Sequence, residues 1–97
     1  MYRMKVYKVK GEILVAVCDS ELVGQTFREG DLKLEVKEDF YGKNDVCEED
    51  VKKALRMATI ANITGKRSVE LAIRLGIVDR DKVIKIGGCL HAQMVVM

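Results

Sequence analysis

The segment from Thr64 to Ser68, TGKRS, combines a glycine with two basic residues and a hydroxyl at the start of an amphipathic pattern. Free N–H groups at a helix start bind anions, and Lys66, Arg67 and Ser68 could complete a phosphate site there. A nucleotide-binding P-loop would need glycine at position 60, serine or threonine at position 67 and a preceding strand. Ile60 and Arg67 stand at those positions, and the pattern predicts a preceding helix, so nucleoside triphosphate hydrolysis is not expected. An anion site and a bare helix joint with solvated basic side chains both stay open.

Two other polar residues could contribute to such a site. Asn62 falls on the inward side of the predicted alanine-rich helix, where a weak helix former needs a reason. A hydrogen bond to a loop carbonyl would explain it, and so would contact with the same ligand. Arg28 beside Phe27 could clamp a base or phosphate, although a turn with local ion pairs is the favoured interpretation. The candidate anion or RNA contacts are therefore Asn62, Gly65, Lys66, Arg67, Ser68 and Arg28.

The segment GGCLHAQ is the second place where residue types suggest chemistry. Its paired glycines allow a sharp turn or a close approach, and alternate residues of the following strand share one face. A packed thiol and a half-exposed imidazole at the start of a strand are the favoured interpretation. The thiol, imidazole and amide on that face could also line a pocket, or the first two could form a nucleophile pair. A zinc site would need further ligands at a recognisable spacing, so no metal is expected. The pocket candidates are Gly87, Gly88, Cys89, His91 and Gln93.

Hydrophobic patterning indicates about five strands that would position these residues. The run ILVAVC is apolar on both faces, which predicts a central strand, whereas DLKLEVK alternates and predicts a half-buried one. The glycine at position 11 suits a tight turn. The predicted strands are Met4–Lys10, Glu12–Cys18, residues 31–37, Lys82–Ile86 and His91–Met97.

Two helices are predicted between these strands. The first begins near Asp45, has acidic residues in its first turn and runs to about Thr64, with Val51, Leu55 and Ala58 on its apolar stripe. Gly65 is expected to end it, and the second helix covers about Lys66–Leu75. Strands, then a helix pair, then strands predict an α+β fold: a mainly antiparallel sheet with the helix pair packed on one face, in one domain over residues 1–97.

Composition limits the function less than the motifs do. A formal charge of +2 is too small to predict nucleic-acid binding, but the first ten residues hold four basic residues and no acid. That strand is a candidate basic patch or an edge strand defended by lysine. Three cysteines without a CxxC spacing are typical of reduced thiols in a cytoplasmic protein. The longest apolar runs are too short to cross a membrane, so no membrane contact is expected.

Three motifs together resemble a small archaeal single-domain family of unknown function. They are GQTFREGDLKLEV, the ATIAN and VELAI helix pair with its glycine joint, and IGGC followed by HAQ. The resemblance covers the chain from Met4 onward and matches Gly24, Phe27, Arg28, Gly30, Asn62, Gly65, Ser68, Gly87, Gly88, His91 and Gln93. The resemblance implies an archaeal cytosolic protein with a broad association with the translation and RNA-processing apparatus, and it assigns no catalytic residue.

The sequence therefore favours a non-enzymatic binding module for RNA or ribonucleoprotein, without a cofactor, contacting phosphates through the TGKRS segment. The alternative is a small enzyme or metabolite-binding protein that uses His91, Cys89 and Gln93 beside the glycine pair. A homo-oligomer formed through an exposed edge strand is a third possibility.

Overall fold

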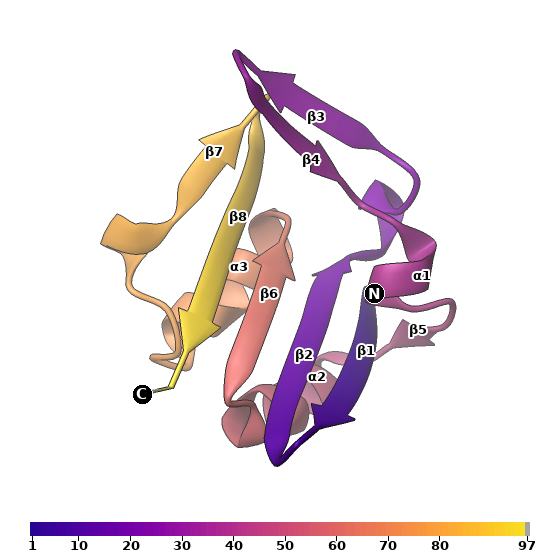
Figure 1. Ribbon diagram of the computed structural model, residues 1–97, viewed down its shortest axis with the longest axis vertical. Coiled ribbons are helices and arrows are strands. Elements are labelled where there is room, and N and C mark those ends of the chain that lie inside the picture. The colour runs from indigo at the N-terminus through magenta and orange to yellow at the C-terminus, as the bar shows by residue number, and fades with distance from the viewer. Residues whose placement is uncertain (97) are drawn as a thin grey trace.

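A computed structural model of the protein describes residues 1–96 and confirms the predicted α+β class. Within these residues the main sheet has six strands in the order β5-β1-β2-β6-β8-β7 (Figure 1). All neighbours are antiparallel except β2 and β6, which run parallel. The strands are β1 (Tyr2–Val9), β2 (Glu12–Asp19), β5 (Asp45–Val46), β6 (Ile60–Thr64), β7 (Ile84–Ile86) and β8 (Cys89–Val95).

The positions of β1 and β2 agree with their patterns. β2 lies inside the sheet between β1 and β6, and Val15–Cys18 are fully buried, as the doubly apolar run predicted. β1 pairs with the short β5 only at Tyr2 and Arg3, which leaves the rest of β1 at the edge of the sheet. The lysines of β1 therefore stand on an edge strand.

Helices α2 (Glu48–Met57) and α3 (Lys66–Arg74) pack on one face of the sheet, here called the helix face (Figure 1). Their apolar stripes meet alternate residues of the strands, because side chains alternate between the two faces. The resulting core includes Val51, Leu55, Val69 and Leu71 together with Val15, Val17 and Ile63.

The prediction of one helix from Asp45 to Thr64 is wrong. Asp45 belongs to β5, α2 starts at Glu48 after an extended Cys47, and the chain becomes extended again at Ala58. Residues 60–64 form β6, which is paired on both sides. Alanines at helical spacing continue the stripe of α2, but the β-branched isoleucines and threonines between them favour a strand. Asn62 is consequently a strand residue.

The opposite face of the sheet, the hairpin face, is only partly covered. Helix α1 (Glu38–Tyr41) and the hairpin β3 (Thr26–Glu29) to β4 (Leu32–Glu35) lie over one end of it (Figure 1). Here Val36 and Tyr41 pack on Ala16 and Cys18 of β2. No helix or strand of residues 1–96 lies in front of the other end, which is formed by the end of β1 and the starts of β2 and β6 (Figure 1).

The hairpin reaches the turn between β7 and β8. The N–H of Gly87 donates to Glu29 Oε1 at 2.9 Å. Gly87 has a positive φ of 55°, and a Cβ on it would lie 2.7 Å from the carbonyl oxygen of Arg28. A side chain at this position would therefore displace the hairpin.

Each of the five predicted strands differs from the structure by one or two residues at one end or both, and the last two strands are examples. A 3-10 turn, η2, occupies Arg80–Lys82, so the strand expected from Lys82 begins at Ile84. The last strand, expected over His91–Met97, is β8 at Cys89–Val95, and Met97 lies outside the described residues. No helix within residues 1–96 has the length and apolar character needed to span a membrane.

Candidate functional site

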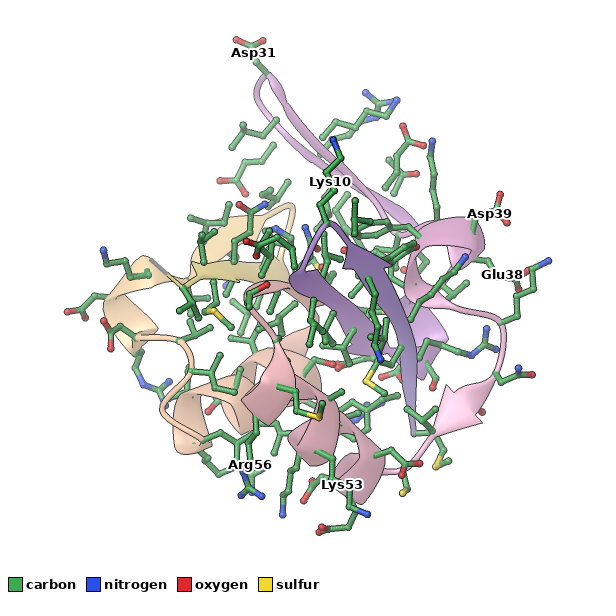
Figure 2. The ribbon with its side chains drawn as sticks, turned by 60° about the horizontal axis from the view of Figure 1, so that its bottom comes forward. Lys10, Asp31, Glu38, Asp39, Lys53 and Arg56 are labelled. Atoms are coloured by element: carbon green, nitrogen blue, oxygen red, sulfur yellow. The ribbon has the colours of Figure 1, made fainter. Side chains whose placement is uncertain are left out.

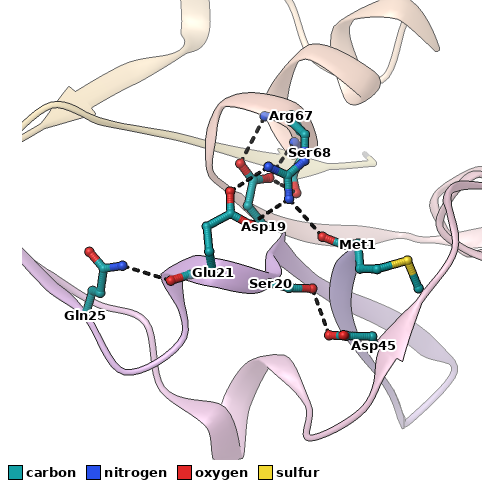
Figure 3. A network of polar contacts seen from close by, with 8 residues as sticks. All are labelled: Met1, Asp19, Ser20, Glu21, Gln25, Asp45, Arg67 and Ser68. Carbon is teal, nitrogen blue, oxygen red and sulfur yellow. Dashed lines mark hydrogen bonds and ion pairs between the residues drawn. The ribbon is translucent and has the colours of Figure 1, made fainter.

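The N-terminus of α3 binds an anion that the protein itself provides, the side chain of Asp19 (Figure 3). Because β2 and β6 are parallel, the last residue of β2 lies beside the loop that follows β6. The N–H of Arg67 donates to Asp19 Oδ2 at 3.1 Å, and the N–H and hydroxyl of Ser68 donate to Oδ1 at 2.9 and 2.7 Å. These bonds satisfy the free N–H groups of the helix start and place a negative charge where the helix dipole favours it.

Gly65 makes room for this carboxylate. Its φ is 106°, and a Cβ on it would lie 2.5 Å from Cγ of Asp19. Gly65 precedes α3 directly and does not end a preceding helix, because the preceding element is β6. The order strand, glycine, helix is that of a P-loop, but Ile60 and Arg67 still stand where its glycine and hydroxyl would be needed.

The guanidinium of Arg67 also binds protein groups. It donates to Oε1 of Glu21 at 2.7 Å and to the carbonyl oxygen of Met1 at 2.9 Å (Figure 3). The hydrogen bonds from Arg67 lower the pKa of the Glu21 carboxyl to about 2. The donors expected to hold a phosphate at Arg67 and Ser68 are thus engaged by Asp19 and Glu21.

The remaining members of the predicted anion set lie in different places. Lys66 and Arg28 are exposed, on α3 and β3 respectively, whereas Asn62 lies on β6 and bonds to Tyr41. The six candidate residues therefore do not form one cluster. Lys66 lines a hollow of about 450 Å³ together with Asp19, Glu21, Leu22, Phe27, Gly65, Lys85, Gly88, Cys89 and Leu90.

Cys89 and His91 share one face of β8, but they do not form a nucleophile pair. The Cys89 thiol donates to the carbonyl oxygen of Leu90 at 3.7 Å, while Nδ1 of His91 bonds to Thr64. Burial, followed by the charge of Asp19, raises the pKa of Cys89, so the thiol stays protonated at neutral pH. His91 and Gln93 line a separate hollow with Lys82, Ile84 and Ala92.

A chain of side-chain hydrogen bonds crosses the hairpin face from α1 to β8. The Tyr41 hydroxyl lies 2.6 Å from Asn62 Oδ1 and 2.8 Å from Thr64 Oγ1. Thr64 Oγ1 lies 2.9 Å from Nδ1 of His91, and Nε2 of His91 lies 3.4 Å from Nε2 of Gln93. The strand register explains the chain, because Thr64 is paired with His91 and Asn62 with Gln93. Sequence reasoning identified Asn62, His91 and Gln93 but missed Tyr41 and Thr64.

All side chains in this hydrogen-bond chain are neutral at neutral pH. Burial raises the pKa of Tyr41 to about 12 and lowers the pKa of His91 below its usual value. Thr64 is fully buried, whereas Asn62 is half-buried and Gln93 is exposed. The middle of this hydrogen-bond chain thus lies in the core under α1, and its two ends are the amides of Asn62 and Gln93 at the surface.

Beside these amides lies the uncovered part of the hairpin face, here called the open face. An apolar groove of about 400 Å³ is formed there by Tyr7, Val9, Lys10, Glu12, Leu14, Phe40 and Ile60. The rings of Tyr7 and Phe40 are stacked with centroids 5.8 Å apart, and Nζ of Lys5 lies 5.2 Å from the Tyr7 centroid. We define the open face as this groove together with Lys5, Asn62 and Gln93.

Sequence reasoning marked the basic first strand as a patch but assigned no role to Tyr7 or Phe40. The tyrosine between the lysines of β1 was the available signal, since aromatic and basic residues alternate in nucleic-acid-binding strands. As for metals, no three His, Cys, Asp or Glu side chains within residues 1–96 are grouped so that they could hold an ion.

The fold and these features define a class: an α+β domain whose sheet is covered by helices on one face and half open on the other. The chain belongs to the family described as Protein of unknown function (DUF424), whose model matches residues 7–97. This confirms the resemblance to a family of unknown function that the three motifs indicated.

The chain is also similar to the crystal structure of an uncharacterized conserved protein from Methanopyrus kandleri. The TM-score is 0.78 at 19% sequence identity, over 96% of this chain and 89% of that chain. At this identity the likeness concerns the fold alone. A search of the curated proteins found no match.

Proposed function

We propose that the protein is a non-enzymatic binding module for single-stranded RNA, and that the RNA lies on the open face. One observation carries the proposal: a stacked pair of aromatic rings, two lysines and two surface amides are gathered on an uncovered part of the sheet. The proposal keeps the RNA partner that the sequence favoured and places the contact away from the TGKRS segment.

The groove has the chemistry that a nucleobase requires. Its walls are apolar and include the half-buried rings of Tyr7 and Phe40, on which the flat face of a base can stack. Stacking is tolerant of sequence, because every base has a π-face. A groove of about 400 Å³ has room for one base with part of its ribose.

Lysines at the rim of the groove provide the contacts to phosphates. Lys10 lines the groove at the turn after β1, and Lys5 lies over the Tyr7 ring. Both side chains are exposed, and neither is in an ion pair with a carboxylate of residues 1–96. Nζ of Lys5 donates to the carbonyl oxygen of Asp39 at 3.1 Å, a neutral partner that leaves its charge uncompensated. Their charges are therefore available to a polyanion, and binding should weaken as salt displaces them.

Single-stranded RNA suits this surface better than a duplex does. Bases reach a sheet surface only when they are unstacked from their neighbours, as in loops and single strands. The hairpin β3–β4 and α1 border the open face, so a wide helix would meet them before its bases reached Tyr7 or Phe40.

The test is binding of a fluorescein-labelled single-stranded RNA of about 12 nucleotides, measured by fluorescence polarisation over a range of salt concentrations. The variant Lys5→Glu/Lys10→Glu should weaken binding at low salt roughly tenfold or more, because it removes two phosphate contacts. It should also make the slope of log K against log salt shallower by about 1.4, at about 0.7 for each contact with a single strand.

The matched control is Lys53→Glu/Arg56→Glu, which makes the same change in net charge. Both residues are exposed on α2, on the helix side of the sheet, and project away from Lys10 (Figure 2). The control should keep most of the affinity and the wild-type slope. Equal losses in the two double variants, or no binding at low salt, would contradict the proposal.

A further inference from the structure

We infer that Asn62 and Gln93 form an oriented donor–acceptor pair that recognises the hydrogen-bonding edge of a nucleobase. This inference rests on the proposed function and concerns the same open face. It specifies the part of the RNA that the two amides recognise, which is a base edge with an acceptor next to a donor. The basis of the inference is the direction of the hydrogen-bond chain that ends at these two amides.

The direction of the hydrogen-bond chain is set by the bond between Tyr41 and Asn62. The Tyr41 hydroxyl donates to Asn62 Oδ1, and a hydroxyl has only one hydrogen to donate. The oxygen of Tyr41 must therefore accept the 2.8 Å bond from Thr64 Oγ1. The single hydroxyl hydrogen of Thr64 is then used as well, so its oxygen accepts the bond from Nδ1 of His91.

The direction continues through the imidazole to the surface. A neutral imidazole carries one N–H, and here it is on Nδ1, so Nε2 is an acceptor. Nε2 of Gln93 lies 3.4 Å from this acceptor and donates to it. In each bond the donor is therefore on the Gln93 side and the acceptor is on the Asn62 side. This direction fixes which atom of each amide, nitrogen or oxygen, takes part in the hydrogen-bond chain.

The two amides present opposite groups to the open face. Asn62 uses its oxygen inside the chain, and its NH₂ makes no hydrogen bond to a side chain or backbone group of residues 1–96. Gln93 uses its nitrogen inside the chain, which leaves its oxygen as the acceptor. The register of β6 and β8 places Asn62 and Gln93 directly opposite each other, so donor and acceptor are neighbours on the surface.

This arrangement favours a base over a phosphate, and an abasic oligomer tests the ribose hydroxyl, which also carries a donor and an acceptor. A phosphate offers only acceptors and would leave the Gln93 oxygen without a donor. The edges of nucleobases carry an acceptor beside a donor and can satisfy both amides at once. The apolar groove next to the amides would hold the face of the same or a neighbouring base.

The first experiment compares two labelled oligomers of equal length: single-stranded RNA and an abasic ribose-phosphate chain. The variants are Asn62→Asp, which keeps an oxygen for Tyr41 but removes the NH₂ donors, and Gln93→Met, which removes the acceptor without adding charge. Each should lower the ratio of RNA affinity to abasic affinity roughly tenfold. The ratio cancels the general repulsion that the new carboxylate of Asn62→Asp adds.

Lys5→Glu/Lys10→Glu serves as the control, because it should weaken both oligomers and leave the ratio near its wild-type value. If wild-type protein binds no RNA at low salt, the proposed function and this inference both fail. If RNA binding depends on the lysines but the ratio is unchanged in Asn62→Asp and Gln93→Met, the inference alone is overturned.

The second experiment tests the direction of the chain without any ligand. Long-range nitrogen–proton NMR correlations distinguish the two neutral tautomers of His91. The chain requires the proton on Nδ1, and Thr64→Val, which removes the acceptor of that proton, should shift the tautomer population toward Nε2. A wild-type His91 protonated on Nε2 would reverse the chain and contradict the inference.

Discussion

Asp19 illustrates how one residue can decide the role of a helix N-terminus. Its carboxylate is 3% exposed and accepts three hydrogen bonds from Arg67 and Ser68. An anion-binding position on α3 therefore stabilises the fold by joining the end of β2 to the start of α3. A ligand phosphate would have to displace a buried carboxylate whose bonds are already made.

The space that Gly65 leaves for Asp19 gives a prediction at the residue scale. Gly65→Ala should lower the free energy of unfolding by roughly 3 kcal/mol, because it adds backbone strain at positive φ and a contact with the carboxylate. Gly76→Ala is the control, since Gly76 also has a positive φ of 75° but no atom within 4 Å of its added Cβ.

Gly76→Ala should lower the free energy of unfolding by only about 1 kcal/mol, because it adds only the backbone strain of an alanine at positive φ. Urea denaturation monitored by circular dichroism measures both variants. Equal losses would mean that the Asp19 carboxylate does not need the space that Gly65 provides.

The sequence signalled some site residues and not others for physical reasons. Asn62, His91 and Gln93 were noticeable because each is polar within an otherwise apolar pattern, and all three are in the hydrogen-bond chain. Thr64 and Tyr41 are ordinary residues for a strand and for a buried aromatic cover, so only their partners show their role. Those partners come from distant parts of the chain, which local patterns do not predict.

At the scale of elements, the two helices of the helix face and four strands of the main sheet (β1, β2, β7 and β8) were predictable. The strands β5 and β6 were missed, because Asp45–Thr64 was interpreted as one helix. The alternation and apolar runs that mark β2, β4 and β8 are local signals. The change from helix to strand near Ala58 depends on pairing: the Thr59 N–H donates to the Ile13 carbonyl, and Thr59 Oγ1 accepts from the Ile13 N–H. The sequence pattern contains no sign of this partner.

The contact between α3 and the 3-10 turn η1 (Ser20–Leu22) gives a pH prediction at the element scale. Arg67 lowers the pKa of Glu21 from 4.5 to about 2. A carboxyl whose pKa is lowered by folding adds stability that is present above pH 4.5 and is lost as the pH falls toward 2. Both side chains are substantially exposed, so the contribution should be below about 1 kcal/mol.

Denaturant titrations of wild type and Arg67→Gln across this pH range measure the effect. The difference in unfolding free energy between them should shrink as the pH falls from 4.5 toward 2. Arg56→Gln removes an exposed arginine from α2 and should give a difference that stays constant over the same range. An Arg67→Gln difference that does not change with pH would show that Glu21 contributes nothing through this contact.

At the scale of the whole molecule, the two faces of the sheet are covered to different extents. The helix face is closed by α2 and α3 over a continuous core, whereas the hairpin face is closed at one end only. The hairpin is held to the β7–β8 turn through Glu29 and Gly87, so it borders the open face without covering it. Aromatic rings, lysines and oriented amides are then left together at the surface of a stable domain.

An amide-resolved NMR titration of the protein with single-stranded RNA directly tests whether RNA binds to the open face. We predict that the largest shifts fall on β1 from Lys5 to Lys10, on Phe40 and on the side-chain amides of Asn62 and Gln93. Residues of α2, such as Lys53 and Arg56, should not shift. Shifts concentrated at the start of α3 around Lys66, or no shifts at low salt, would contradict the assignment of RNA binding to the open face.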